Sequence, residues 1–307
     1  MGSTNSAPLG GVLPVFQTPF LDDESIDWET LEAELHWLFD RGANAVVMAL
    51  ASELLRLSGD ERERMAQFVC ETVGERGPGV VSVGAESSIV AERFARHAEA
   101  SGASAVMAIP PISVSPSSAE LRSYYERLLR ATTLPVIIQD ASGYVGQVIP
   151  LELQSQLLDE YGAARVLFKP EAGPSGPRLT ALMEATGGRA RIFEGSGGGA
   201  LLESHRRGVS GTMSGADVHV GIVALWRALE ANDDERAYRL SLPITTMVSY
   251  ERSLDAFLAI EKHLLVKQGV FKNVRTRGPG DFVLDDVTRS EVDRLFEFIL
   301  EAARAAD

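Results

Sequence analysis

A lysine stands at the end of an apolar run near the middle of the chain. Residues 164–168 are Ala-Arg-Val-Leu-Phe, Lys169 follows, and Pro-Glu-Ala-Gly comes next. This pattern predicts a buried strand that ends at Lys169 in a turn, and α/β folds gather their reactive groups at such strand ends. The chain has only four lysines and otherwise uses arginine, which cannot form an imine. Two roles therefore fit Lys169: an amine nucleophile, or a side chain that extends from a strand end into a salt bridge.

A lysine in a pocket suits imine chemistry. Burial disfavours the charged ammonium form, and the neutral amine attacks a ketone to give an imine, which serves as an electron sink for cleaving or forming an adjacent bond. Serine hydroxyls and backbone N–H groups could hold the carboxylate of a 2-oxo acid. Gly-Ser-Gly-Gly-Gly at 195–199 offers such N–H groups. The alternatives for these glycines are a tight turn between strand and helix, or a phosphate site.

The order of elements predicts how these residues are positioned. Apolar runs predict eight strands, each followed by a helical pattern, and the runs begin near residues 12, 45, 80, 105, 134, 165, 190 and 209. This repeat predicts an α/β fold, a (β/α)8 TIM barrel. A doubly wound open sheet is the alternative, but no G-x-G-x-x-G follows the first strand.

Four helical patterns at the end of the chain exceed what the barrel needs to close. They cover 219–231, 234–249, 252–268 and 289–305. We therefore expect a disordered lead-in at 1–10, a barrel at 11–230 and a C-terminal helical domain at 231–307. The surplus helices are expected either on the barrel flank or in a subunit contact.

Metal binding is the competing chemistry. Asp217 and His219 follow the eighth strand, and four carboxylates near other strand ends could join them in holding a divalent ion. These carboxylates are Glu53, Asp140, Glu171 and Glu194. The sequence has no H-x-H or H-E-x-x-H spacing, so no metal and no other cofactor is expected.

Composition excludes several classes of partner. The net charge of −14 would repel nucleic acid and anionic membranes. No apolar stretch is long enough to span a bilayer, and the first residues lack the pattern of a signal peptide. The single cysteine, Cys70, suits a reducing cytosol. These features predict a cytoplasmic protein with a small-molecule substrate.

The motifs and their order resemble the dihydrodipicolinate synthase / N-acetylneuraminate lyase superfamily of pyruvate-type class I aldolases. The resemblance covers about 11–300 and rests on the Glu53 turn and on four segments: TPF at 18–20, FKPEAG at 168–173, EGSGGGALLES at 194–204 and GVSGTMSG at 208–215. It implies a TIM barrel with a C-terminal helical domain, a homotetramer built as a dimer of dimers, and Lys169 as the Schiff-base lysine. The implied partners are a pyruvate-like 2-oxo acid and, as a further candidate, an aldehyde.

The sequence departs from this family at four places. The usual G-T-T-G-E or G-S-x-G-E is Ala-Leu-Ala-Ser-Glu at 49–53, and the usual Pro-Tyr-Tyr is Pro-Pro-Ile at 110–112. The usual Tyr-Asn, whose tyrosine shuttles protons, is Gln139-Asp140, and Tyr144 matches the synthase's substrate-binding arginine. Glutamine cannot titrate and cannot act as a general base. These departures argue against ordinary dihydrodipicolinate synthase and sialic acid lyase activities.

We therefore expect a Schiff-base lyase for pyruvate or a related 2-oxo acid, with Lys169 as nucleophile. Gln139 would orient the substrate or a water molecule, and Glu171 or Asp140 would transfer protons. Asp140 is also a candidate for substrate binding. The other candidates are Ser52, Ala51, Gly195, Ser196, Met213, Ser214 and Tyr144. The alternatives are a 2-keto-3-deoxy sugar-acid dehydratase, which also forms an imine, and a low-turnover or non-catalytic homologue that binds an oxo acid.

Overall fold

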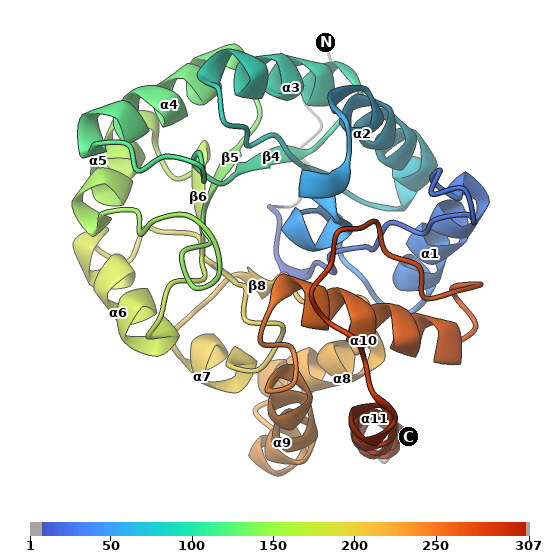
Figure 1. Ribbon diagram of the computed structural model, residues 1–307. Coiled ribbons are helices and arrows are strands. Elements are labelled where there is room, and N and C mark those ends of the chain that lie inside the picture. Colours follow the sequence, from blue (N-terminus) through green and yellow to red (C-terminus); the bar gives the residue numbers. More distant parts are fainter. Residues whose placement is uncertain (1–7, 305–307) are drawn as a thin grey trace.

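A ring of eight parallel strands surrounded by helices forms the centre of the molecule (Figure 1). The computed structural model describes residues 8–304, so most of the expected lead-in at 1–10 lies outside the described residues. The strands are β1 (Gly11–Val12), β2 (Val46–Met48), β3 (Gly79–Ser82), β4 (Ala105–Ala108), β5 (Val136–Asp140), β6 (Val166–Pro170), β7 (Phe193–Glu194) and β8 (Gly211–Thr212).

Helices follow the strands in regular alternation. Those of the outer ring are α1 (Trp28–Asp40), α2 (Gly59–Val73), α3 (Ser88–Ala100), α4 (Ser118–Ala131), α5 (Leu151–Tyr161), α6 (Ser175–Ala185), α7 (Leu201–Arg206) and α8 (His219–Glu230). Beyond them lie α9 (Asp234–Val248), α10 (Leu254–Lys267) and α11 (Asp286–Arg304). The expected TIM barrel with a C-terminal helical extension is confirmed.

Two sheets close into one barrel through single bridges. Strands β2 to β6 form one sheet in sequence order, and β1, β8 and β7 form the other. Val15 bridges to both Val47 and Gly215, and Phe168 bridges to Ile192, so both seams are joined. Several strands are shorter than the apolar runs that predicted them. Beyond β1, for example, the pairing with the neighbouring strand continues only as single hydrogen bonds, such as that from the N–H of Val15 to the carbonyl of Ser214 (2.8 Å).

Side chains alternate between the inside of the barrel and the helix-facing side. Ile137 and Leu167 pack in the barrel interior, whereas Ile138 and Phe168 pack in the cluster that joins the strands to the outer helices. Because successive strand residues face opposite sides, the residues two positions further along also face inward. In β5 and β6 these are Gln139 and Lys169, which are direct partners in the strand register.

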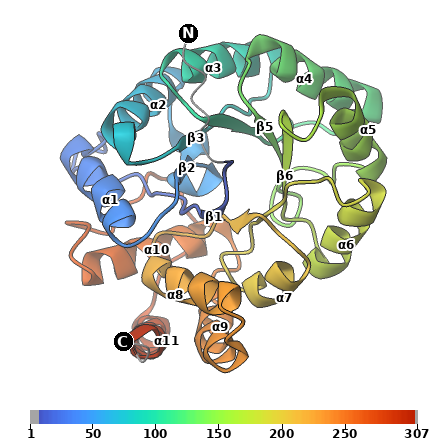
Figure 2. The ribbon, with the colours of Figure 1, turned by 180° about the vertical axis from the view of Figure 1, so that it is seen from behind.

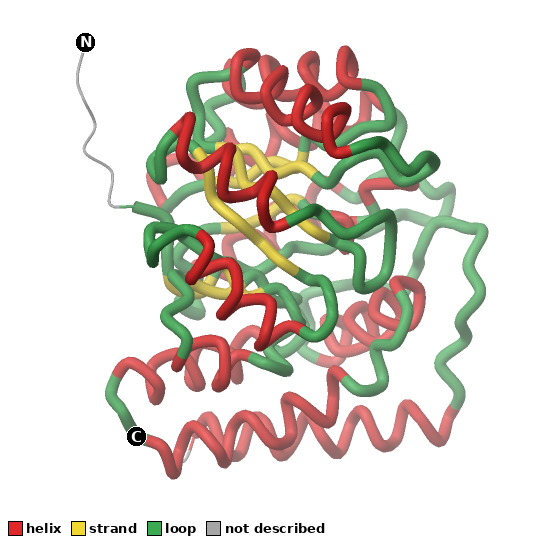
Figure 3. Tube along the Cα trace, turned by 90° about the vertical axis from the view of Figure 1, so that its left-hand side faces the viewer, coloured by secondary structure: helices red, strands yellow, loops and turns green. Residues whose placement is uncertain are grey.

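The last three helices pack against the barrel flank beside α8 (Figures 2 and 3). Their core contains Ile222 of α8, Leu240 of α9, Ile260 of α10 and Phe296 of α11. The flank was one of the two positions expected for the surplus helices. The division of the chain at residue 230 and the dimer of dimers stay predictions. Within residues 8–304, no helix combines the length and the apolar composition needed to cross a membrane.

Buried charged residues fasten α10 to the barrel. Lys262 donates to the carbonyls of Thr18 (2.8 Å) and Arg275 (2.6 Å) and pairs with Glu53. Its neighbour Glu261 accepts a hydrogen bond from the backbone N–H of Ala216 (2.5 Å). Removing one partner of a buried ion pair leaves the other charge uncompensated and costs about 3–5 kcal/mol, so this contact holds the helical layer in a fixed position over the barrel.

Glu34 lies in the same buried region and is expected to make stability depend on pH. Its Oε1 accepts from the N–H of Gln17 (2.9 Å), and burial raises its pKa from 4.5 to about 8. The unfolded chain releases this proton near pH 4.5, whereas the folded chain keeps it until about pH 8. The free energy of unfolding therefore falls as pH rises through this window, by up to about 1.4 kcal/mol per pH unit for one proton.

The measurement is urea unfolding of the wild type and of Glu34→Gln between pH 5 and pH 8. The glutamine is neutral at every pH, so the variant should lose stability less steeply than the wild type as pH rises. Glu29→Gln, an exposed position on the same helix that pairs with Lys272, should keep the wild-type slope. Equal slopes for Glu34→Gln and wild type would contradict the raised pKa.

Candidate active site

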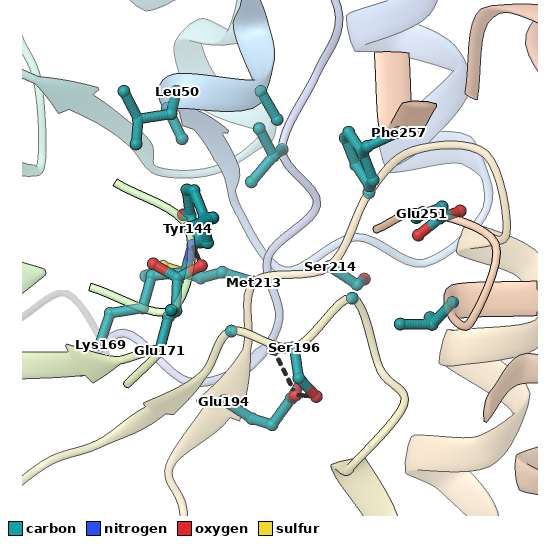
Figure 4. A pocket seen from close by; sticks show the side chains of 18 of the residues that line it. Leu50, Tyr144, Lys169, Glu171, Glu194, Ser196, Met213, Ser214, Glu251 and Phe257 are labelled. Atoms are coloured by element: carbon teal, nitrogen blue, oxygen red, sulfur yellow. Dashed lines mark hydrogen bonds and ion pairs between the residues drawn. The ribbon is translucent and has the colours of Figure 1, made fainter. Parts of the chain in front are cut away.

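A pocket opens where the carboxyl ends of the barrel strands meet (Figure 4). Its volume is about 290 Å³, at the lower end of small-molecule pockets, which span roughly 300–1,000 Å³. Apolar residues such as Val15, Leu50 and Leu179 make up much of the lining. The polar lining residues include Gln139, Tyr144, Lys169, Glu171, Glu194, Ser196, Ser214, Glu251, Arg252 and Ser253.

Lys169 is 3% exposed and reaches this pocket from the end of β6. Its Nζ lies 3.0 Å from Oε1 of Glu171. The other oxygen of Glu171 accepts from the amide of Gln139, at 2.6 Å. Glu171, two residues past Lys169, therefore points the same way as the lysine. One carboxylate holds both the amine and the amide in place.

Tyr144 completes this group from the loop after β5. The residue is 44% exposed, but its hydroxyl group faces inward, 3.4 Å from the amide nitrogen of Gln139 and close to the carboxylate of Glu171. Burial, and next the Glu171 carboxylate, raise the pKa of the Tyr144 phenol well above its ordinary value. A phenol thus stands beside the lysine in a chain whose fifth strand lacks the family's tyrosine, a contact that strand-end reasoning missed.

Gly195 is required by the close approach of this group to β7. A Cβ atom at Gly195 would lie 2.6 Å from Cγ of Glu171 and 2.9 Å from Cε of Lys169, closer than real Cβ contacts allow. The glycine therefore makes room for the lysine and the glutamate. Ala51, Met213 and Ser214 also line the pocket as expected, and no described residue is hydrogen-bonded to the hydroxyl of Ser214.

Two expected site residues lie outside the pocket lining. The side chain of Ser52 is buried beneath it, where its hydroxyl donates to the carbonyl of Phe16 (2.6 Å). Asp140 follows Gln139 on the strand and therefore faces the helices, where it accepts from the N–H of Ile149 (3.0 Å) and from Arg178 (3.3 Å). Neither group is free to contact a substrate, so the structure leaves Glu171 as the carboxylate nearest to the lysine.

The glycine-rich segment at 195–199 forms a turn in which the carboxylate of Glu194 occupies the place where a bound anion was expected. Ser196 donates its backbone N–H to Oε1 of Glu194 (2.6 Å), and Thr212 donates to the other oxygen (2.6 Å). Gly197 and Gly198 have positive φ angles of 66° and 90°, which favour glycine. Of the readings open for this segment, the tight turn fits best. Ser196 lines the pocket with its hydroxyl bound to Glu194.

The carboxylates considered for metal binding are dispersed over the barrel. Glu53 pairs with Lys262, and His219 is buried with its Nε2 bonded to the carbonyl of Leu38 (3.1 Å). Across residues 8–304 no group of three or more histidine, cysteine, aspartate and glutamate side chains is arranged to hold a metal ion. The site described above therefore consists of an amine, a carboxylate, an amide and a phenol.

Part of the lining comes from a segment that strand-end reasoning does not reach. Glu251, Arg252 and Ser253 of the α9–α10 connection, with Leu254 and Phe257 of α10, form one wall. In Figure 4 Glu251 and Phe257 lie across the pocket from Lys169 and Tyr144. Nothing in the sequence next to the strand ends marks these residues, because their position depends on how the extra helices pack.

Comparison with protein families places the chain. The model described as the Dihydrodipicolinate synthetase family matches residues 8–280. The chain therefore belongs to this family of aldolase- and lyase-type enzymes.

Curated relatives carry two different activities. An L-2-keto-3-deoxyarabonate dehydratase from Azospirillum brasilense is 25% identical over 300 residues, 95% of either chain. A 4-hydroxy-tetrahydrodipicolinate synthase from Acidothermus cellulolyticus is 30% identical over 158 residues, and the match spans 51% of each chain. A second synthase, from Rhizobium meliloti, is 22% identical over 264 residues, 85% of this chain and 84% of the synthase.

Solved structures share the fold along almost the whole chain. A putative dihydrodipicolinate synthetase from Pseudomonas aeruginosa has a TM-score of 0.87 at 24% identity, covering 95% of this chain and all (100%) of the other. A prophage protein of the dihydrodipicolinic acid synthase family from E. coli K12, solved in complex with pyruvate, has a TM-score of 0.85 at 20% identity, covering 96% and 99%. At these identities the likeness shows the fold alone.

The close packing at Gly195 yields a test of the site geometry. Gly195→Ala should displace Lys169 and Glu171. On the expectation that Lys169 forms an imine with a 2-oxo acid, it should slow that adduct formation by about ten- to a hundredfold, since a shift of about 1 Å can cost a hundredfold in rate. Gly59→Ala is the matched control, because its Cβ would meet only one ring atom of Phe94, at 3.8 Å. An unchanged rate in Gly195→Ala would show that the pair has room to spare.

Proposed function

We propose that the protein is a Schiff-base lyase that forms an imine between Lys169 and the ketone of a 2-oxo acid. The carrying observation is the buried amine of Lys169, in a pocket and 3.0 Å from the carboxylate of Glu171. Membership of the family and the pyruvate named in the complex of the related prophage protein support this choice of substrate class.

The proton steps follow from the contacts of Glu171. Its Oε1 accepts a proton from the ammonium group of Lys169, which frees the amine to attack the carbonyl carbon. The resulting carbinolamine must lose its hydroxyl group as water. Tyr144, whose phenol lies 3.4 Å from the amide nitrogen of Gln139 and close to Glu171, would give the proton to that leaving oxygen. Glu171 and Tyr144 together would replace the missing tyrosine after β5. Gln139 would fix the orientation of the Glu171 carboxylate through its hydrogen bond.

The free polar groups that remain are suited to the oxo acid itself. The hydroxyl of Ser214 and Oε1 of Gln139 are buried and have no partner within residues 8–304. Buried polar atoms are normally satisfied, so both are expected to bond to a bound substrate. Gly195 and Ala51 supply the adjoining backbone. This assignment takes the place of the one that relied on Ser52 and Asp140.

A sugar-acid dehydratase is the second candidate. It is favoured by the L-2-keto-3-deoxyarabonate dehydratase, a relative whose match covers 95% of this chain. Such an enzyme needs no binding site for a separate aldehyde, and Tyr144 lies where the synthase's substrate-binding arginine was expected. Both candidates begin with the same imine at Lys169.

The imine itself can be trapped. Sodium borohydride added to the protein with pyruvate should reduce the imine to a stable secondary amine, and peptide mass spectrometry should place the added mass on Lys169. Lys169→Ala should give no adduct, while Lys267→Ala, which removes a half-buried lysine that pairs with Asp293, should label as wild type does. An adduct that persists in Lys169→Ala would overturn the proposal.

Glu171 is expected to control the rate at which the imine forms. Glu171→Gln keeps the shape of the side chain but cannot take up a proton, so imine formation should slow by at least about tenfold, since general acid–base help is usually worth about 10²–10⁴-fold. The variant should also lose one limb of the pH–rate profile measured by stopped-flow mixing with pyruvate.

Two further variants complete this experiment. Tyr144→Phe should slow the step too, because it removes the phenolic proton but leaves Glu171 in place. Asp140→Asn, whose carboxyl faces the helices, should keep the wild-type profile. If Glu171→Gln and Tyr144→Phe both react at the wild-type rate, protons move through solvent and the reading as a low-turnover binding protein is preferred.

A further inference from the structure

The pocket extends away from Lys169 to a second polar end. In Figure 4 Lys169, Glu171 and Tyr144 lie at one side, Ser214 lies between, and Glu251 lies at the other side. Val248 and Phe257 flank Glu251 with apolar surface. A pocket with polar groups at both ends and apolar walls fits a ligand that is itself polar at both ends and longer than pyruvate.

The far end holds two neighbouring carboxyl groups, those of Glu251 and Asp217, each of which shifts the pKa of the other. Burial, and next the Asp217 charge, raise the pKa of Glu251 well above its ordinary value, while burial raises that of Asp217 to about 6. The two carboxyl groups therefore disfavour carrying a negative charge at the same time.

The pair is tightly enclosed on the side away from the pocket. Asp217 is 1% exposed, and its Oδ2 has no partner within the described chain. A Cβ atom at Gly215 would lie 2.7 Å from Oδ1 of Asp217 and 2.8 Å from Oε1 of Glu261, so a third acid stands close by. The nearby ammonium of Lys262 is bound to Glu53 instead. The region is therefore rich in carboxyl groups, and Arg252 lies beside Glu251 in the same wall of the pocket.

A carboxyl group accepts a hydrogen bond from a hydroxyl group whether or not it is protonated. It therefore suits a hydroxyl group better than an anion or a purely apolar end. Ser214, which lies between the two ends, is assigned to the oxo-acid head, so Glu251 is the polar group that the far carbons of an extended substrate would meet. An apolar chain end would give Glu251 no hydrogen bond.

We propose that Glu251 determines specificity by hydrogen-bonding a hydroxyl group on the far carbons of the substrate. The substrate is then a 2-oxo acid with a hydroxylated carbon chain, as in a 2-keto-3-deoxy sugar acid, rather than pyruvate alone. This inference rests on the proposed imine at Lys169. It deepens that proposal by giving the α9–α10 connection the task of choosing among 2-oxo acids.

The test compares three probes that share the same oxo-acid head. They are pyruvate, 2-oxopentanoate and 4,5-dihydroxy-2-oxopentanoate, and the last two have equal chain lengths but differ in their hydroxyl groups. Borohydride trapping over a range of concentrations gives a half-saturation value for each. Wild type should bind the dihydroxy compound about ten- to a hundredfold more tightly than 2-oxopentanoate, because a site built for a hydroxyl group rejects an analogue that lacks it.

Two substitutions at the same position separate the hydrogen bond from the fold. Glu251→Leu should bring the preference for the dihydroxy compound close to one, whereas Glu251→Gln, still polar, should keep most of it. The pyruvate adduct measured in each variant reports whether Lys169 is still in place. Glu235→Gln, which changes an exposed glutamate of α9, is the matched control and should keep the full preference.

Each contrary result has its own meaning. If pyruvate is trapped on Lys169 but wild type shows no preference between the two five-carbon acids, or Glu251→Leu keeps the preference, the assignment of Glu251 is wrong and the lyase proposal stands. If 2-oxoglutarate binds more tightly than the dihydroxy compound and Arg252→Gln abolishes that preference, the far end is an anion site and the proposal is also wrong. If none of the probes forms an adduct, the imine proposal fails first and this inference fails with it.

Discussion

The alternation of side chains along β5 and β6 governs which residues can take part in chemistry. Only every second residue of a barrel strand faces inward, and only the last inward residue reaches the pocket. In these two strands that residue is Gln139 or Lys169, and the register sets them side by side. Glu171 continues the inward direction by two positions and meets the lysine at 3.0 Å. One backbone rule thus assembles the nucleophile and its nearest carboxylate.

The same rule explains how far the sequence could predict the site. The eight strands, the barrel and the position of Lys169 follow from apolar runs that a reader can see in the chain. Asp140 looked equally suitable because it ends a strand, but it occupies an outward position and bonds Ile149 and Arg178. Tyr144 and Ser52 could not be placed, since a loop can turn a side chain either way and only packing decides which.

Long-range contacts account for the other surprises. The glycines at 195–199 suggested an open anion site, yet Glu194, buried two residues before Ser196, fills it. That filling depends on the conformation of a turn, for which glycine permits many choices. The wall containing Glu251 depends on helices that follow the barrel in the chain and return across its mouth. No local sequence pattern predicts that helices so late in the chain line the pocket.

The barrel and the helical layer contribute different walls to the pocket. The strands supply the lysine and its carboxylate, while the layer fastened by Lys262 supplies the opposite wall. Substitutions in the α9–α10 connection can therefore remodel the far wall without disturbing a single strand. Substitutions in this short connection could therefore change which substrates bind, while the strand-borne half of the pocket keeps its lysine and carboxylate.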